Sequence, residues 1–417
     1  MSLDSNDYCL KEINELCELN SSSYSKKDNW EFINYLDTKN IIKGEINEIK
    51  YLDPEMDKVP SRAKRKVNIN DIIISTVRPN QEHYGIIKKE YDNFLVSTGF
   101  TTLTVDTSQA VPEFIYYYIT QPYITQSLQT IAEQSTTSYP SVKPSDIGNL
   151  IVELPSLDIQ NKIANILTSI ENKINVNKEI NKNLVTLAKT IFRDKFIFYK
   201  GYESHMIKTD FGEIPDTFEV KSIDEISKEV ICGKTPSTKV EENYGNKMPF
   251  ITIPDMHGNV FVINTERKLS EIGIQSQIKK ILPKNSICVS CIATAGLVSL
   301  TSEESQTNQQ INSIICKDSV SPYFVYLYME ELSKYVKMLG SGGSTTLNLN
   351  KREFGKIELV IPPQKDMIKF HGQISPLFDK IKSNQYEINY LTKLRDTLLP
   401  KLMSGELDVS EINCDLE

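Results

Sequence analysis

The sequence contains no long apolar run. It never approaches the roughly 18 to 20 consecutive apolar residues that a helix needs to cross a bilayer. Its first residues, Met1 to Tyr8, have neither the basic region nor the apolar region of a secretory signal. We therefore expect a cytoplasmic protein without a membrane partner.

The 7 cysteines and 4 histidines form no recognisable site. An odd number of cysteines scattered through a long chain does not predict a disulfide framework. Cys288 and Cys291 form one C-x-x-C pair. No second pair follows at zinc-ligand spacing, so we interpret both as buried strand thiols. The histidines are dispersed without metal-ligand or catalytic-triad spacing, and we predict no metal site.

Motifs for nucleotide hydrolysis and methyl transfer are also missing. The glycine-rich segment at residues 340–343 lacks the lysine that completes a G-x-x-x-x-G-K-[ST] loop. An adenine methyltransferase needs Asn/Asp-Pro-Pro-aromatic, and the nearest match is Pro362-Pro363-Gln364. We predict no catalytic residues and no cofactor. We interpret the glycine-rich segment as a turn; the alternative is that its amides, with Ser344 or Thr345, contact phosphate.

The net charge of −8 argues against a nucleic-acid partner, because neutralising phosphates requires a basic surface. Basic residues nevertheless cluster at residues 62–66 and again at Lys234, Lys239 and Lys247. A total charge averages over faces that do different work, so charge alone does not decide the partner.

The chain repeats itself. At 417 residues it is too long for one core, which predicts two domains. Three segments of the first half recur in the same order in the second half: 70–75 in 285–290, 112–118 in 322–328, and 138–155 in 345–362. The last match continues without a gap to Asn177 and Asn384, and chance does not explain it.

The repeat predicts a mixed α/β protein with four parts: a first globular domain at 1–155, a long helix at 156–200, a second globular domain at 201–362, and a second long helix with a tail at 363–417. Each globular domain has strand-like runs, at 71–77 and 149–154 and at 286–293 and 356–361. Each also has one helical run opened by a proline, at 112–134 and 322–339.

Heptad spacing predicts that the two long helices pair in antiparallel fashion as a coiled coil. Asparagine occupies the seam at equivalent places, Asn177 and Asn384, where a polar residue costs stability but fixes register. The alternative is an ordinary amphipathic surface helix that tolerates an asparagine. The residues predicted to pair the helices are Ile163, Ile170, Ile174, Asn177, Leu184, Leu377, Ile381, Asn384 and Leu391.

A helix of about 40 residues is about 60 Å long, or roughly one and a half to two turns of B-DNA. Two DNA-reading domains held at that spacing would contact two half-sites separated by bases that neither touches, and the helices would then act as a spacer.

Several phrases make the chain resemble the specificity subunits of Type I restriction-modification systems. They include Asn34-Tyr-Leu-Asp-Thr-Lys-Asn-Ile41, Gly233-Lys-Thr-Pro-Ser-Thr238 and Leu394-Arg-Asp-Thr-Leu-Leu-Pro400. The resemblance covers essentially the whole chain. It implies two target-recognition domains that each read half of a bipartite site in double-stranded DNA, and helices that bind two modification subunits. A restriction subunit then joins; these partners would use S-adenosylmethionine, ATP and Mg, while this chain catalyses nothing.

Base reading needs cationic or amide side chains on loops, with short donors to fix the register. In the first domain the candidates are Lys26, Lys27, Arg62, Lys64, Arg65, Arg78, Gln81, Tyr84, Thr137 and Tyr139. In the second they are Lys234, Thr235, Ser237, Lys239, Asn308, Gln309, Ser344 and Thr345. The alternatives are solvated surface cations and, for residues 308–310, a capped turn. We interpret Trp30 as a core residue rather than a base-stacking platform.

Three other functions stay open at this point. A coiled-coil scaffold without DNA is favoured by the acidic charge, and a nuclease with an unrecognised site is a second alternative. The third is a specificity subunit of a system that only modifies DNA. Salt-dependent duplex binding separates the DNA readers from the scaffold.

Overall fold

The computed structural model describes residues 8–134, 140–292, 294–340 and 349–412. The chain forms two compact units, one made of Met1–Asn172 with Thr392–Glu417 and the other of Lys173–Leu391. Two 40-residue helices, α5 (Leu157–Phe196) and α12 (Gln364–Met403), contribute a segment to each unit. The domain limits predicted from the sequence differ from this division, because they treat each long helix as a separate part of the chain. These limits stay predictions. Within the described residues no helix has the length and apolarity needed to span a membrane.

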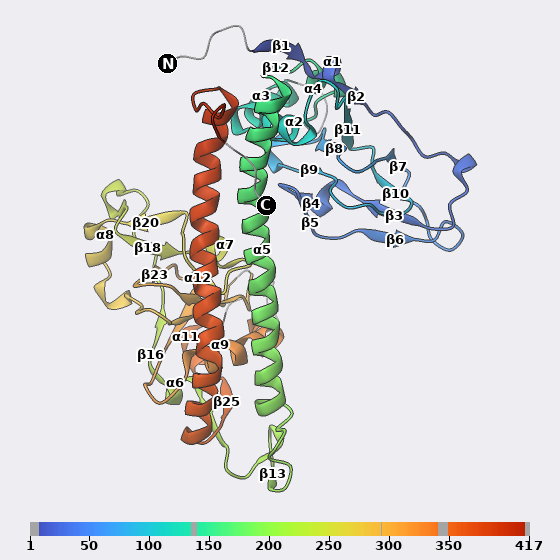
Figure 1. Ribbon diagram of the computed structural model, residues 1–417. Coiled ribbons are helices and arrows are strands. Elements are labelled where there is room, and N and C mark those ends of the chain that lie inside the picture. Colours follow the sequence, from blue (N-terminus) through green and yellow to red (C-terminus); the bar gives the residue numbers. More distant parts are fainter. Residues whose placement is uncertain (1–7, 135–139, 293, 341–348, 413–417) are drawn as a thin grey trace. The chain divides into compact units, whose positions relative to one another are not determined.

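The first unit contains two four-stranded sheets (Figure 1). In order across each sheet, the strands are β2 (Cys17–Leu19), β11 (Phe100–Val105), β8 (Ile72–Ser75) and β9 (Tyr84–Ile86), and then β6 (Lys50–Leu52), β3 (Ile33–Leu36), β10 (Phe94–Ser97) and β7 (Ala63–Lys66). Strand β8 is apolar on both faces: Ile72 and Ile74 enter one core, and Ile73 enters another. A strand buried on both sides requires this continuous apolar run.

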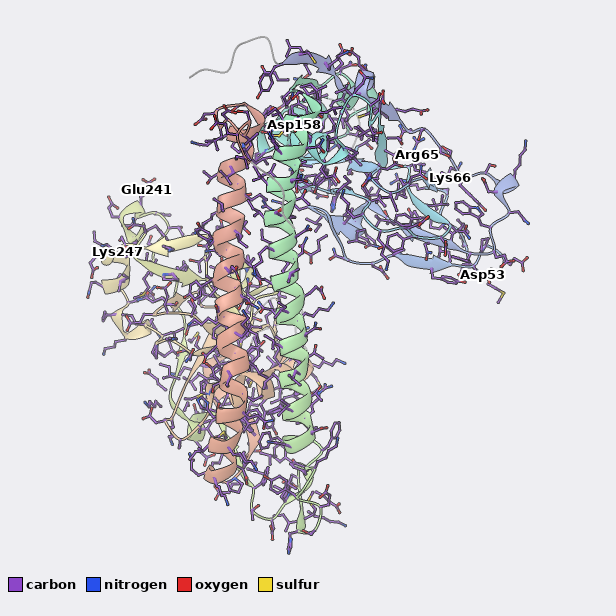
Figure 2. The ribbon with its side chains drawn as sticks, viewed as in Figure 1. Asp53, Arg65, Lys66, Asp158, Glu241 and Lys247 are labelled. Atoms are coloured by element: carbon purple, nitrogen blue, oxygen red, sulfur yellow. The ribbon has the colours of Figure 1, made fainter. Side chains whose placement is uncertain are left out.

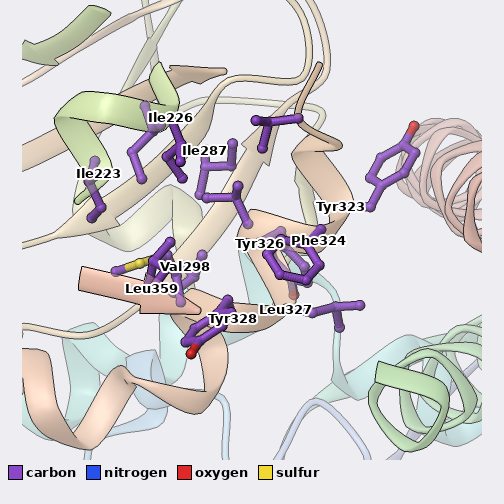
Figure 3. Close-up of a cluster of buried hydrophobic side chains, with 14 of the residues drawn as sticks. Ile223, Ile226, Ile287, Val298, Tyr323, Phe324, Tyr326, Leu327, Tyr328 and Leu359 are labelled. Atoms are coloured by element: carbon purple, nitrogen blue, oxygen red, sulfur yellow. The ribbon is translucent and has the colours of Figure 1, made fainter. Parts of the chain in front are cut away.

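The second unit repeats this plan. In order across each, the strands of its two larger sheets are β16 (Ser227–Cys232), β24 (Ile311–Cys316), β21 (Ile287–Ser290), β22 (Val298–Thr301) and β19 (Phe261–Val262), and then β17 (Tyr244–Gly245), β20 (Arg267–Leu269), β18 (Met248–Ile251) and β23 (Gln306–Thr307). Helix α9 (Pro322–Glu331) packs on β21 and β22, and Figure 3 shows Phe324 of this helix in one buried cluster with Ile287 and Val298. Cys288 enters the core on the opposite face of β21.

Equivalent backbone hydrogen bonds hold both units together. In each unit a strand that opens the repeated part pairs with the strand before a long helix: β1 (Cys9–Glu12) with β12 (Ile151–Leu154), and β15 (Glu219–Ser222) with β25 (Glu358–Ile361). The internal repeat is therefore a repeat of tertiary structure. The matching bonds are Ile13 N to Leu150 O and Ile223 N to Ile357 O, Asp106 N to Leu16 O and Lys317 N to Ile226 O, and Val142 N to Thr76 O and Leu349 N to Cys291 O.

Each run predicted as one proline-opened helix is in fact two helices. The first run divides into α2 (Pro112–Ile119) and α3 (Pro122–Glu133). Pro122 cannot donate a backbone hydrogen bond, and it holds Gln121 in an extended conformation. The second run divides at Leu332 into α9 and α10 (Ser333–Gly340), and nothing in the sequence marks that break.

The antiparallel pairing of α5 and α12 is confirmed within each unit (Figure 1). In the first unit, Ile163 and Leu167 of α5 share a core with Leu402 of α12. In the second unit, Asn384 Nδ2 donates to Asn181 Oδ1 at 2.9 Å, and Asn177 Nδ2 donates to Glu387 Oε2 at 2.9 Å. Both seam asparagines are buried, at 1% and 0% exposure, but each bonds a different polar residue of the other helix.

The other predicted seam residues differ in burial. Ile163, Ile174 and Ile381 are buried, whereas Ile170, Leu184, Leu377 and Leu391 are half-buried. Phe378, next to Leu377, is fully buried because it packs against Tyr323 and Phe261 of the globular part. Helix α12 therefore serves two interfaces, one with α5 and one with the sheets.

Candidate nucleic-acid interface

In the second unit, the loop at residues 233–239 lies directly against the turn at residues 308–310. Gly233 N donates to Ile311 O at 3.1 Å, and Lys234 N donates to Thr307 O at 2.9 Å. A Cβ at position 233 would lie 2.2 Å from Asn308 O, so only glycine permits this approach. Two candidate segments that are far apart in sequence thus form one surface.

Side chains beneath the loop fix its path. Tyr244 OH donates to Pro236 O at 3.0 Å, and Asn243 Nδ2 donates to Ser237 O at 3.1 Å. Asn243 and Pro236 are buried. The sequence does not predict that Asn243 and Tyr244 support the loop, because nothing in their spacing shows that their side chains lie against it. Their hydrogen bonds hold the loop backbone in one conformation.

The three neighbouring amides of the turn do different things. Asn308 is 8% exposed, donates from Nδ2 to Gln310 Oε1 at 3.0 Å, and accepts from Gln310 N at 3.1 Å. These two residues therefore form the capped turn that was the alternative interpretation. Gln309 is exposed, and its Oε1 accepts a hydrogen bond from Thr235 Oγ1 at 2.5 Å.

Charged side chains of both signs lie on the loop and on the residues that follow it. Lys234, Ser237, Lys239 and Lys247 are exposed, as is Glu241. Figure 2 shows Lys247 and Glu241 on the outer loops of this unit. The cations suit phosphate contacts, which position a protein on a duplex without reading its sequence.

In the first unit, the basic cluster at residues 62–66 lies on and beside the edge strand β7 (Figure 2). Arg62 and Lys64 are exposed. Arg65 is half-buried, and among the described residues its buried Nε has no hydrogen-bond partner. Arg62, directly before the edge strand, and Lys64, on it, are therefore open to solvent.

Lys66 has a structural partner instead. It forms an ion pair with Asp28, and this bond lowers the pKa of that carboxyl below its ordinary value. Its ammonium lies 5.2 Å from the ring centroid of Trp30, which packs against Tyr24 at 4.9 Å. Trp30 is half-buried beside a small core, as expected for a packing residue. Lys26 begins the adjoining 3-10 turn η1 (Lys26–Asp28), and Lys27 in it is exposed.

A second exposed segment of the first unit is the 3-10 turn η3 (Pro79–Gln81), which follows Arg78. Arg78 and Gln81 are both exposed. Arg78 has a positive φ of 50°, and its N–H donates to Pro140 O at 3.0 Å. The turn is therefore fixed to the segment that begins at residue 140.

Tyr84 lies apart from these exposed groups. It is half-buried, packs beside the core of the first unit, and its ring contacts that of Tyr116 at 6.2 Å. Burial raises its pKa above the ordinary value. Four further candidates, Thr137, Tyr139, Ser344 and Thr345, lie outside the described residues.

Both cysteines predicted to be buried strand thiols are buried, but only Cys288 lies in a strand, since β21 ends at Ser290, directly before Cys291. Cys288 is 0% and Cys291 1% exposed, and burial raises the pKa of each to about 12. Such thiols are poor metal ligands and poor nucleophiles at neutral pH. In the part of the chain that the structure describes, no group of three or more His, Cys, Asp or Glu side chains is arranged to hold a metal.

Comparison with known proteins finds one family over most of the chain. Residues 5–186 and 215–393 match the model of the Type I restriction modification DNA specificity domain. The chain is 33% identical over 427 residues to the Type I restriction enzyme HindI specificity subunit of Haemophilus influenzae, covering 87% of this chain and 93% of that protein. It is 29% identical to the Type I restriction enzyme MjaIX specificity subunit of Methanocaldococcus jannaschii, covering 72% and 70%.

A solved structure has a similar fold. The Type-I restriction-modification system S subunit from M. genitalium superposes with a TM-score of 0.60 at 17% identity, covering 96% of this chain and 98% of that one.

Proposed function

Because the chain belongs to the family of Type I restriction-modification DNA specificity domains, we propose that each of its globular domains reads one half of a bipartite DNA site. The chain contributes affinity, register and base preference. It has no catalytic role of its own: methyl transfer to adenine and DNA cleavage belong to the modification and restriction subunits, which use S-adenosylmethionine, ATP and Mg.

One observation carries this proposal: the two units share a scaffold but differ in the side chains they expose. Equivalent backbone bonds recur in both, yet the second unit exposes an amide and lysines on residues 233–239 and 309, whereas the first exposes Arg62 and Lys64 on a strand edge. Different side chains can make equivalent contacts to phosphates, but side chains that differ in their donors and acceptors pair with different base edges. The two domains therefore read different half-sites.

The long helices supply surfaces for the protein partners. Val176 and Leu187 of α5 are 52% and 47% exposed, and Tyr386 and Tyr390 of α12 are 43% and 65% exposed. Exposed apolar and aromatic side chains are enriched at protein interfaces. These residues support docking of modification subunits, two per chain as the internal repeat suggests, with the helices as the spacer between the half-sites.

The test is to express the chain with its modification subunit and map methylated adenines in the host DNA. The expected methylation pattern is two fixed half-sites that flank a constant gap. The logarithm of the binding constant for that site should fall linearly with the logarithm of the salt concentration. Methylation without a sequence rule, or duplex binding without a salt slope, would overturn the proposal and favour a scaffold. Adding the restriction subunit then separates a restricting system from one that only modifies.

A further inference from the structure

We propose that Gln309 reads an adenine·thymine pair in the second half-site, and that Thr235 is the positioning residue that sets the direction of its carboxamide. This inference rests on the proposed function and adds to it a base, a reading residue and a support for that residue.

The turn leaves Gln309 as its outward-facing amide. Asn308 and Gln310 bond each other twice, and Asn308 is 8% exposed. Asn308 N also donates to Ile251 O at 3.1 Å, which holds the turn on strand β18. The backbone carbonyl of Gln309 accepts from Cys232 Sγ at 3.7 Å, while its side chain is exposed.

The hydrogen bond to Thr235 holds the carboxamide of Gln309 with its oxygen, Oε1, toward the threonine hydroxyl. The hydroxyl of Thr235 donates to Gln309 Oε1 at 2.5 Å and occupies one lone pair of that oxygen. The carboxamide then has two N–H donors and one acceptor position with which to bind a ligand. Without this bond the amide could rotate and exchange the places of its donor and acceptor.

An amide with a fixed direction selects adenine in the major groove. Adenine presents the N7 acceptor beside the N6 amino donor, and a glutamine pairs with both. Guanine presents two acceptors, N7 and O6, so the fixed Oε1 would face another oxygen. That repulsion adds a penalty against G·C to the attraction for A·T.

Backbone hydrogen bonds hold together the two segments that carry Thr235 and Gln309. Lys234 N donates to Thr307 O at 2.9 Å, and Gly233 N donates to Ile311 O at 3.1 Å, so the segment carrying Thr235 is joined to the segment carrying Gln309. A side chain on such a support loses little additional backbone freedom when it binds.

The first unit has a different residue at this place and serves as an internal control. Cys291 N donates to Gln310 O, and at the equivalent point Thr76 N donates to Gly99 O, so Gln309 corresponds to Thr98. An amide reader at this position therefore belongs to the second half-site alone.

The test uses the complex of the full chain with its modification subunits and a set of duplexes in which each base pair of both half-sites is replaced in turn. The wild-type complex is expected to prefer A·T by about 10- to 100-fold at one position of the second half-site. Gln309→Ala should remove that preference and leave every other position unchanged. Thr235→Val should weaken the same preference, and Thr235→Ser should restore it.

The outcomes separate the two proposals. Loss of binding to all duplexes equally, or unchanged preferences in Gln309→Ala, contradicts base reading by Gln309. An unchanged preference in Thr235→Val contradicts the positioning role. A wild-type complex without preference in either half-site contradicts the proposed function itself. Intact discrimination in the first half-site shows, for each variant, that the protein is folded and assembled.

Discussion

Gly233 is a residue at which two backbone segments of the second unit approach closely. An alanine there would place its Cβ 2.2 Å from Asn308 O and 2.4 Å from Thr307 O, and backbone atoms cannot yield as a flexible side chain can. We predict that Gly233→Ala lowers the free energy of unfolding by about 1–3 kcal/mol, as overpacking usually does. Urea unfolding followed by circular dichroism measures this loss.

Gly372 is the matched control for that substitution, with the opposite expected sign. It lies in the interior of α12 and is exposed, and a Cβ at this position would meet no neighbouring atom within 4 Å. Alanine favours a helix interior over glycine, so Gly372→Ala should raise the free energy of unfolding by about 0.5–1 kcal/mol. Destabilisation by both alanines would show that the close approach at Gly233 is not the cause of its loss.

Lys382 of α12 should make stability depend on pH. Its ammonium donates to Ser302 O at 2.5 Å. Burial, together with the nearby Lys284, lowers its pKa to about 8, although Asp379 and Glu303 act in the opposite direction. In the unfolded chain its pKa is about 10.4.

Between these two pKa values the unfolded chain binds more protons than the folded one, so this lysine's contribution to stability improves as pH rises from about 8 to about 10. We predict that wild type gains stability relative to Lys382→Met over this range. Chemical unfolding of both proteins at several pH values measures the difference, from which the tyrosines common to both cancel. A pH-independent difference would contradict the assignment.

At the scale of elements, an ion pair fixes α12 on α5 in the first unit. Arg395 Nη1 donates to Glu171 Oε2 at 2.7 Å, and the two side chains are 24% and 29% exposed. Removing only the arginine leaves a half-buried carboxylate without its cation. We predict that Arg395→Met costs about 1–3 kcal/mol, less than a fully buried pair because solvent screens part of the charge.

The double variant Arg395→Met with Glu171→Leu should recover most of that loss, because the apolar pair leaves no unpaired charge between the helices. Asp396, which Arg395 also contacts at 2.8 Å, is 59% exposed and stays solvated in both variants. A double-mutant cycle by urea unfolding gives the coupling energy. Simple additivity of the two single losses would mean that the ion pair does not join the helices.

The elements were predictable where periodicity is local. Strands such as β8 and β21, and the long helices, follow from apolar patterns within one segment. The seam could be predicted only in part, because α12 also packs on the sheets and buries Phe378 more than Leu377. The meeting of Thr235 with Gln309 could not be predicted, since the two lie 74 residues apart and are joined by tertiary structure alone.

The candidate DNA-binding residues also differ in how well the sequence predicts their exposure. Exposure of Arg62 and Gln81 agrees with their polar surroundings in the sequence. The sequence predicts Tyr84 on a loop, but it belongs to strand β9 and packs beside the core with Tyr116. The face on which such a residue lies depends on strand pairing, which one sequence does not reveal.

At the scale of the whole molecule, an acidic protein must bind DNA through local cations. The chain has 47 Lys and Arg residues against 55 Asp and Glu. We predict that Lys234→Gln lowers the magnitude of the salt slope of the DNA complex by about 1 and weakens specific and unrelated duplexes alike.

Lys356→Gln is the control, since it removes the same charge from a lysine that is paired with Glu353 at 3.0 Å. Its salt slope should match that of wild type. Equal changes in both variants would mean that only the total charge matters. Titrations at several salt concentrations, on cognate and scrambled duplexes, measure both slopes.

The closing strands of each unit have an evolutionary consequence. Glu12 faces Ile151 across one antiparallel pair, and Ser222 faces Glu358 across the other, so the chain enters each repeated part and leaves it at neighbouring points. Whatever folds between those points is an insert with a fixed pair of attachment sites. Recombination at these junctions would exchange a whole globular insert while the long helices stayed unaltered, and one genetic event would then give the chain a new DNA target.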